Sequence, residues 1–380
     1  MGRLVILLIP FLLFISCNIL DQNKNQKAVE YLEQEMEQQG IPGLQAIVIQ
    51  KNEIVLSENL GFANVPFSIR TQENTIFSIN SIAKVFAATA IMQLVEKGKF
   101  QISEPISMHI DGLPDDWSEI TIEQLLSHTS GLPDIEDPNT EGLIGGKGPD
   151  SAWVKVRKMP LQFKAGAKFN YNATNYLLIQ KLIEKYGESS FEAFVKKNQF
   201  DIAQMHKTVF GNSFDVVENK SPTYSYYLMD KAIGDYVKGD QLLEVSEEFP
   251  SMLRADAGAF SSAHEMAKWV LALQSGKFLQ NNTSIEKMWQ AVQLDDGSYG
   301  GFGDIFNGYG LGWPVVNREN HPAVLPIGGG RAAFAIYPED KLTIILFTNL
   351  SGVLVHEIVE SLSKIYLDNT DSSPYWTTPH

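Results

Sequence analysis

A serine and a lysine stand three residues apart in the stretch Phe77–Phe86, directly before a long apolar segment. We predict that this segment is a buried helix that opens at or just before Ser81, with Asn80 as its N-cap. On such a helix Ser81 and Lys84 share one face, with about 5–6 Å between their Cβ atoms. A hydroxyl beside a partly desolvated amine can become a nucleophile, because the amine can take the hydroxyl proton. Alone, however, this short pattern equally describes an ordinary helix start with a surface lysine.

Segments with strand character lie at both ends of the chain, and helical segments fill the middle. Residues 45–50 and 53–57 predict a hairpin, and residues 332–337 and 342–347 predict another across a turn at 338–341. Helical spacing marks residues 120–126, 176–186, 190–197, 266–273 and 354–365. The order predicts an α/β (α+β) fold, in which an antiparallel sheet built from N- and C-terminal segments is flanked by helices and carries an inserted, mostly helical domain. Residues 134–152 resemble a surface excursion, and residues 213–250 give no clear pattern.

Composition excludes several classes of function. The 380 residues carry a formal net charge of −15, which opposes nucleic acid and anionic membrane surfaces as electrostatic partners. The seven histidines are scattered and form no His-x-His-x-Asp cluster, so no metal site is predicted, and no cofactor is implied. A Gly-x-Ser-x-Gly elbow, the mark of an α/β-hydrolase, does not occur in the sequence.

The first 17 residues have the features of a lipoprotein-type signal peptide. Residues 4–15 are apolar, but this run is shorter than the roughly 20 residues that a spanning helix needs. It ends at Cys17, the only cysteine, in a Phe-Ile-Ser-Cys sequence that resembles a bacterial lipobox with Phe14 where leucine is usual. We expect lipidation at Cys17 and a place in the bacterial cell envelope, on the periplasmic or outer-surface side; ordinary secretion and a retained anchor are the alternatives. A polar tether (18–27), one folded domain (28–368) and a C-terminal tail (369–380) would follow.

Several motifs then stand in the order of a known family. The block Phe77–Lys84 resembles the nucleophile block of serine β-lactamases and penicillin-binding proteins. Leu125–Leu132 resembles the structural block that follows it in the class C-like branch, with its family VIII-type esterases. Phe169–Tyr176 falls where that branch has Tyr-x-Asn, and Tyr309–Trp313 and Gly328–Asn349 resemble its closing sheet. The similarity extends over nearly the whole predicted domain.

This resemblance implies a serine hydrolase that works through an acyl-enzyme. Ser81 would be the nucleophile, and Lys84 its proton partner. Tyr171 would act as general base and then as acid to the leaving group. Because the pKa of a free tyrosine is near 10, that role requires a nearby positive charge, and we expect Lys84 to lower the pKa of Tyr171. The oxyanion hole would consist of the backbone N–H of Ser81 and that of Gly330, with Gly329 as the next candidate.

The sequence departs from the family pattern at two positions. Ala173 replaces the asparagine of Tyr-x-Asn. Ile327 stands where the closing strand normally carries a lysine or histidine that holds a substrate carboxylate. His321 and Arg331 flank this position and are candidates to supply the charge, although a rise of about 3.3 Å per strand residue places both well away from it.

Three further polar residues lie near these motifs. Asn172 and Asn175 neighbour the missing amide of Ala173, but neither occupies its position. His128 belongs to a His-Thr-Ser-Gly string that suggests catalysis. In the resembled family this string is structural, so we expect a buried, hydrogen-bonded histidine.

The two departures bear on the substrate more than on the nucleophile. Losing one charge-assisted hydrogen bond to a carboxylate would cost about 1.5–3 kcal/mol of binding energy. We therefore expect weak or absent β-lactam hydrolysis, and action on small esters, amides or cell-wall-related compounds. The alternative is a lipid-anchored binding module that keeps the fold without turnover.

Overall fold

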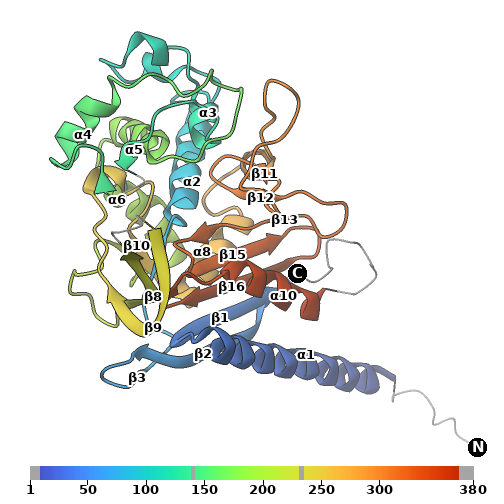
Figure 1. Cartoon of the computed structure of the whole chain (residues 1–380). Helices are drawn as coiled ribbons and strands as arrows, with labels where there is room; N and C mark the ends of the chain where they lie inside the picture. Colours follow the sequence, from blue (N-terminus) through green and yellow to red (C-terminus); the bar gives the residue numbers. More distant parts are fainter. Residues whose placement is uncertain (1–8, 138–141, 231–234, 368–380) are drawn as a thin grey trace, which may run out of the picture.

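The structure is a computed structural model that describes residues 9–137, 142–230 and 235–367 (Figure 1). The helices of these ranges are α1 (Ile9–Gln39), α2 (Ala83–Glu96), α3 (Ile122–Leu126), α4 (Pro149–Val156), α5 (Ala173–Gly187), α6 (Phe191–Val195), α7 (Asp201–Ala203), α8 (Ala263–Gln274), α9 (Asn282–Trp289) and α10 (Val355–Tyr366), with short turns η1 (Ile106–Met108), η2 (Asp115–Trp117), η3 (Lys196–Phe200) and η4 (Ser251–Leu253). The strands are β1 (Gly43–Gln50), β2 (Glu53–Asn64), β3 (Ile69–Arg70), β4 (Phe77–Asn80), β5 (Glu136–Asp137), β6 (Gly142–Leu143), β7 (Val209–Phe210), β8 (Thr223–Asp230), β9 (Asp235–Val245), β10 (Ala259–Ser261), β11 (Gly308–Tyr309), β12 (Pro314–Val316), β13 (Ala323–Val324), β14 (Ile327–Gly328), β15 (Ala332–Tyr337), β16 (Leu342–Thr348) and β17 (Leu350–Ser351).

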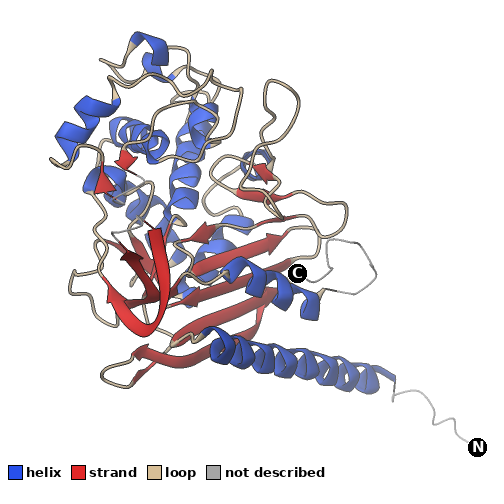
Figure 2. Cartoon of the chain, viewed as in Figure 1, coloured by secondary structure: helices blue, strands red, loops and turns tan. Residues whose placement is uncertain are grey.

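An antiparallel sheet forms the base of the molecule (Figure 2). Its strands follow the order β11-β12-β13-β15-β16-β1-β2-β3, and β14 adds to one end of β15. β1 from the start of the domain pairs with β16 from its end, with Ile47 opposite Ile345. The N- and C-terminal segments therefore close one sheet, as the strand order in the sequence predicted.

Both faces of this sheet are buried, which explains the nearly continuous apolar character of its central strands. On β16, Ile344 and Leu346 belong to a core cluster beneath α1 and α10, whereas Ile345 and Phe347 belong to the larger cluster around α2, α5 and α8. Successive strand residues point to opposite faces, so a run of apolar residues fills two cores at once. The terminal helices α1 and α10 lie against each other on one face (Figure 1).

Two predicted hairpins are confirmed. Lys51 and Asn52 join β1 to β2 with φ values of 52° and 68°, the two positive angles that a tight type I′ hairpin turn requires. Residues 338–341 join β15 to β16, and Ile336 pairs with Thr343 across this second hairpin. Local turn chemistry thus sets the register of the four strands at the centre of the sheet.

The inserted part of the chain stands on one edge of the sheet and is largely helical (Figure 1). Its central element is α2, in which every residue from Ala83 to Leu94 is buried. The segment around 134–152 contains β5, β6 and α4, and the unassigned region 213–250 forms the long β8–β9 hairpin. The fold class predicted from the sequence is confirmed, and this hairpin is the main element that the pattern missed.

Two local predictions were wrong or incomplete. Asn80 does not cap α2: the helix begins at Ala83, no side chain caps it, and Asn80 ends β4 with a φ of 42°. Residues 18–27, where we expected a tether, are part of α1. Residues 1–8 of the predicted signal peptide and the whole predicted tail (369–380) lie outside the described residues. Within the described ranges, no helix combines the length and apolar character needed to cross a bilayer.

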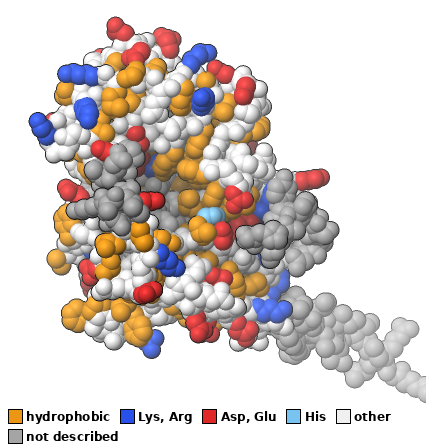
Figure 3. All heavy atoms as spheres, viewed as in Figure 1, with side chains coloured by type: hydrophobic (Ala, Val, Ile, Leu, Met, Phe, Trp, Pro, Cys, Tyr) orange, Lys and Arg blue, Asp and Glu red, His pale blue; other side chains and the backbone are white. Residues whose placement is uncertain are grey.

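The surface carries charges of both signs. Lysine and arginine side chains alternate with aspartate and glutamate side chains over the face shown in Figure 3. On this face the charges of the two signs are interspersed.

One contact fixes the distance between the sheet and the strand that precedes the predicted nucleophile. Gly328 of β14 packs on the backbone of Ile79 in β4, and a Cβ added at Gly328 would lie 2.0 Å from the Ile79 carbonyl oxygen. No real pair of atoms tolerates that separation, so the absence of a side chain at Gly328 allows the two strands to approach.

We predict that Gly328→Ala lowers the free energy of unfolding by about 2–3 kcal/mol, because the strands must move apart. Chemical denaturation measures the change. Gly239→Ala is the control, since the nearest atom to its added Cβ would be a backbone oxygen 3.8 Å away. Equal effects of the two substitutions would contradict the assigned contact.

Candidate active site

Ser81 lies in the tight turn between β4 and α2. The turn is held by backbone hydrogen bonds from Ile82 N to Ile79 O and from Lys84 N to Ser81 O, each 3.1 Å long. The side chain of Asn80 accepts a hydrogen bond of 2.9 Å from Ser78 Oγ, which stabilises its left-handed conformation. Ser81 is partly exposed, whereas the helix behind it is buried. The fold therefore places the Ser81 hydroxyl at the N-terminal end of the buried helix α2.

Lys84 is almost completely buried, with 2% of its side chain exposed, and its Nζ faces this turn. It donates to Ser81 Oγ at 3.3 Å and to the backbone oxygen of Asp256 at 3.0 Å, and it forms an ion pair of 2.8 Å with Asp256 Oδ1. Two of these contacts are hydrogen bonds, and the third brings a carboxylate oxygen against the amine. The lysine thus holds Ser81 as a charged donor.

Asp256 is the site residue that sequence reasoning missed. It lies in the turn after η4, just ahead of β10, and Ala259 of that strand pairs with Asn80 of β4. The aspartate belongs to no motif that we recognised. The sequence contained only an indirect indication of this residue: a lysine in an apolar helix requires an acidic partner elsewhere in the fold.

Tyr171 completes the group. Lys84 Nζ lies 4.5 Å from the centroid of its ring, and its hydroxyl forms a hydrogen bond with Ser81. The structure thus brings together the hydroxyl, amine and phenol that the sequence singled out, from the turn after β4, from α2 and from the loop before α5.

The expected direction of the Tyr171 pKa was wrong. Burial, and next the negative charge of Asp256, raise the pKa of Tyr171 well above its usual value near 10; the hydrogen bond from Ser81 opposes this only in part. The phenol is therefore neutral at physiological pH. Lys84 is not among the main influences on this pKa, and the Asp256 carboxylate lies 2.8 Å from its Nζ.

Aromatic rings enclose the phenol. The ring centroid of Tyr171 lies 4.2 Å from that of His128 and 5.1 Å from that of Phe302. His128 is fully buried, and its Nδ1 accepts a hydrogen bond of 3.3 Å from Asn172 N. Burial, followed by the charge of Lys84, holds the pKa of His128 well below its ordinary value. The prediction of a buried, hydrogen-bonded histidine is confirmed.

The amide missing at Ala173 is not restored by its neighbours. Asn172 caps α5 by accepting from Asn175 N at 3.2 Å, and Asn175 Oδ1 accepts from Ser130 Oγ at 2.6 Å. Instead, Asp134 Oδ1 accepts a hydrogen bond of 3.0 Å from Ala173 N. Burial raises the pKa of Asp134 to about 6, although the hydrogen bonds from the backbone N–H groups of Glu136 and Ala173 oppose this shift.

The closing strand differs from expectation in its register. Ile327 packs with the core cluster beneath α10, on the sheet face opposite to Ile79 and Ile82. Gly328, not Ile327, faces the nucleophile turn. The side chain at position 327 therefore does not project towards Ser81, and its lack of charge has less weight than we expected.

The two candidate oxyanion glycines form a tight turn after β14. Gly329 and Gly330 both have a φ of 56°, a left-handed conformation that favours glycine. Val353 N donates to Gly330 O at 2.9 Å, and Ser351 Oγ donates to Gly329 O at 3.2 Å. These bonds hold the turn beside the nucleophile loop, since a Cβ at Gly329 would lie 2.4 Å from Asn80 Nδ2. Their oxyanion role stays a prediction.

The two candidate cations have different places. Arg331 is buried near Asn80 and forms an ion pair with Glu247. His321 lies elsewhere: its Nδ1 is 2.8 Å from Asp340 Oδ1, in the turn beyond the far end of β15. A six-residue strand spans about 20 Å, so His321 is not part of the site. Its predicted role as a substrate-binding cation is wrong.

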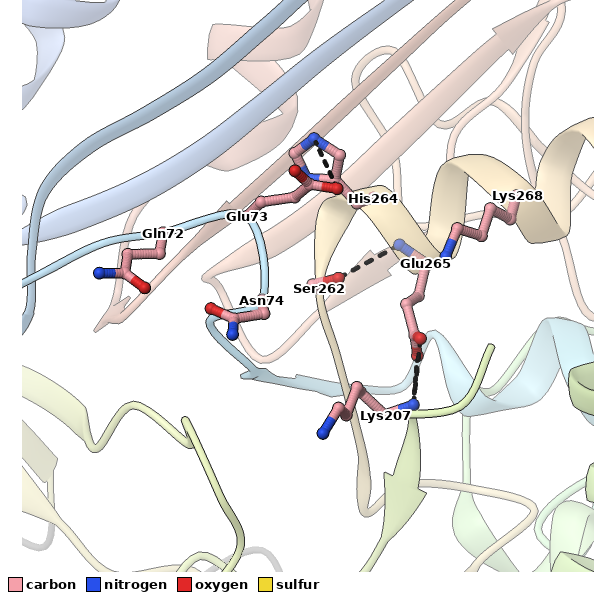
Figure 4. A pocket seen from close by; sticks show the side chains of 8 residues that line it. All are labelled: Gln72, Glu73, Asn74, Lys207, Ser262, His264, Glu265 and Lys268. Atoms are coloured by element: carbon pink, nitrogen blue, oxygen red, sulfur yellow. Dashed lines mark hydrogen bonds and ion pairs between the residues drawn. The ribbon is translucent and has the colours of Figure 1, made fainter. Parts of the chain in front are cut away.

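A separate cavity of about 390 Å³ lies at the start of α8 (Figure 4). It is lined by Gln72, Glu73, Asn74, Lys207, Ser262, His264, Glu265 and Lys268. Several of its polar groups serve the structure: Ser262 Oγ caps α8 by accepting from Glu265 N at 3.2 Å, and Glu265 in turn accepts from Lys207 N at 3.0 Å. Ser81, Lys84 and Tyr171 do not line this cavity.

Comparison with known proteins assigns the chain to one family. The model of the Beta-lactamase family matches residues 28–360, and the chain belongs to this family. PbpX, a candidate penicillin-binding protein of Bacillus subtilis (strain 168), is 28% identical over 335 residues, which are 87% of this chain and 75% of that protein.

Two solved structures share the fold at lower identity. EstCE1, a hydrolase with promiscuous acyltransferase activity, superimposes with a TM-score of 0.74 at 17% identity, over 92% of this chain and 100% of its own. The D-amino acid amidase from Ochrobactrum anthropi SV3, complexed with L-phenylalanine amide, has a TM-score of 0.72 at 20% identity, over 92% and 98% of the two chains.

We predict that Asp256→Asn destabilises the fold by about 3–5 kcal/mol, because it leaves the buried Lys84 ammonium without its counter-charge. Equilibrium unfolding in denaturant measures this loss. The double variant Lys84→Met/Asp256→Asn should lose less than the sum of the two single changes, since neither charge then stays unpaired. Strict additivity would show that the ion pair contributes nothing.

A second prediction concerns pH. The folded-state pKa of Asp134 is raised to about 6 from 3.8, so its ionisation reduces stability as pH rises through this interval. Asp134→Asn should therefore stabilise the protein at pH 8 by on the order of 2–3 kcal/mol and have little effect at pH 4. Thermal melts of both proteins across this range measure the difference. Asp296→Asn is the control: hydrogen bonds from Ser298 lower the pKa of this exposed carboxyl, so its removal should give no such gain.

Proposed function

We propose that this protein is a serine hydrolase that forms an acyl-enzyme on Ser81. The observation that carries the proposal is the convergence of three side chains, in which Lys84 Nζ donates to Ser81 Oγ at 3.3 Å and Ser81 in turn bonds the Tyr171 hydroxyl. Membership of the Beta-lactamase family supports the assignment. The hydroxyl is thereby held by a cation on one side and a proton acceptor on the other.

The neutral phenol favours a proton relay over a phenolate base. Ser81 Oγ attacks the carbonyl carbon of the substrate, and its proton passes to the Tyr171 oxygen. The Tyr171 proton passes to the leaving oxygen or nitrogen as its bond to carbon breaks, so the phenol ends the step neutral. Water then attacks the acyl-enzyme, and the same relay returns the proton to Ser81. Lys84 stays an ammonium throughout and stabilises the charge that develops at Ser81.

We propose small esters and amides without a nearby carboxylate as the substrate class. The carboxylates of Asp134 and Asp256 lie close to the reacting groups, whereas both nearby cations, Lys84 and Arg331, are paired with acidic side chains. An anionic acyl donor would therefore meet no free cation among these groups. EstCE1 is a hydrolase with promiscuous acyltransferase activity, and the amidase of similar fold is complexed with L-phenylalanine amide, a compound without a carboxylate; both support this choice.

For location, we propose that a lipid on Cys17 anchors the domain to the cell envelope. This proposal rests on the lipobox-like sequence and on its place ahead of the folded domain. Metabolic labelling with a fatty-acid analogue, lost in Cys17→Ser, is the corresponding assay.

We expect the protein to hydrolyse a short-chain p-nitrophenyl ester faster than a chromogenic cephalosporin. Ser81→Ala should abolish this activity and the covalent label from a fluorophosphonate probe. Tyr171→Phe should lower kcat about 10²–10⁴-fold, because the relay is lost. Tyr299→Phe, an exposed tyrosine, is the control and should keep full activity. A clear preference for the cephalosporin would overturn the substrate class, and absence of any Ser81-dependent label would favour a non-catalytic binding module.

A further inference from the structure

Arg331 is an unusual cation beside the nucleophile turn, because only 1% of its side chain is exposed. Its Nη2 forms a close ion pair with Glu247 Oε1. Its Nε has no hydrogen-bond partner within the described part of the chain, and neither has the second oxygen of Glu247. The guanidinium is thus held by one oxygen, although its fork can bind both oxygens of a carboxylate.

This ion pair lies next to the predicted nucleophile. The same Glu247 oxygen accepts a hydrogen bond of 3.4 Å from Asn80 Nδ2, and Asn80 immediately precedes Ser81. The guanidinium also borders the candidate oxyanion turn, since a Cβ at Gly329 would lie 2.9 Å from Arg331 Nη2. Glu247 therefore joins the strand that delivers Ser81 to the start of β15.

Glu247 comes from a separate part of the chain, the segment between β9 and η4. Its backbone N–H donates to Ser213 Oγ at 2.6 Å, and Ser213 N donates to Glu247 O at 3.0 Å. With 21% of its side chain exposed, Glu247 covers Arg331 on the solvent side. The segment after β9 is thus anchored so that its carboxylate reaches the buried guanidinium.

We propose that Glu247 is an internal carboxylate that fills the anion-binding position of Arg331 and thereby excludes anionic acyl donors from the Ser81 site. Because the charges of Arg331 and Glu247 cancel, a substrate carboxylate gains no net electrostatic attraction from Arg331. The Glu247 carboxylate, on the solvent side, also repels a substrate carboxylate that approaches it. This proposal makes Glu247 a specificity-determining residue. It rests on the proposed function, because it concerns substrates that acylate Ser81.

The test compares benzylpenicillin with its methyl ester, which differ in one carboxylate. In Glu247→Gln the amide keeps the shape and the contact with Asn80, but the charge of Arg331 is unmasked. The ratio of Ser81 acylation rates, acid over ester, should rise by about tenfold or more, as expected for a gained charge-assisted hydrogen bond. Glu248→Gln removes the same charge from the exposed neighbouring residue and should leave the ratio unchanged.

Two further variants define the outcome. Glu247→Ala should shift the ratio in the same direction, and it serves if Glu247→Gln folds poorly. Arg331→Gln/Glu247→Gln should lose the gain, because no cation is left to unmask. An unchanged ratio in both single variants, or a gain that persists in the double variant, would overturn the proposal.

A binding measurement separates this proposal from the proposed function. In the Ser81→Ala background no acylation occurs, and calorimetry can compare phenylacetylglycine, a carboxylate, with its neutral N-methylamide. Adding Glu247→Gln should strengthen binding of the carboxylate about tenfold and leave the amide unchanged. If the wild-type protein hydrolyses nothing but this gain occurs, the hydrolase proposal fails and the role of Glu247 stands. If hydrolysis occurs without the gain, the reverse holds.

Discussion

The buried ion pair between Lys84 and Asp256 is the constraint on which the rest of the site depends. A lysine placed in the first turn of a helix that is buried on every side requires a partner, and Asp256 supplies a carboxylate and a backbone oxygen. The same ammonium donates to Ser81 Oγ. After burial, the Asp256 charge is the next cause that keeps the phenol of Tyr171 protonated. The pair thus holds the donor to the nucleophile in place and contributes to the protonation state of its neighbour.

Much of the fold could be predicted because its signals are local. Lys51 and Asn52 mark a hairpin by their turn chemistry, and Ser262 marks the start of α8 by its capping bond to Glu265. The β8–β9 hairpin was not predicted, because apolar side chains of both strands, such as Leu228 and Val237, are exposed, so apolar residues do not mark one buried face. Sequence patterns reveal elements that bury one face, and this hairpin buries little.

The site could be predicted only where residues are marked by motifs. Ser81, Lys84 and Tyr171 stand in recognisable sequence motifs. Asp256 and Glu247 stand in none: Asp256 contacts Lys84, 172 positions away in the chain, and Glu247 contacts Arg331, 84 positions away. We expected the side chain of Ile327 on the sheet face that carries Ser81, but it lies on the opposite face. The glycines that follow show no alternation of apolar and polar side chains from which the strand register could be read. We predicted a lowered pKa for Tyr171, but burial and the Asp256 charge raise it. Both effects arise from the folded structure, and the spacing of motifs along the sequence does not reveal them.

The pairing of β1 with β16 has a consequence for how the chain acquires its structure. Leu44 pairs with Thr348, so the central sheet cannot close until nearly the whole polypeptide has emerged. Contacts between such remote segments are slow to form, because a long loop must be ordered first. During synthesis, the apolar strand β1 therefore stays without its neighbour. Until β16 has been synthesised, we expect protection of β1 from aggregation to come from outside the domain, for example from a chaperone that binds the unfolded nascent chain.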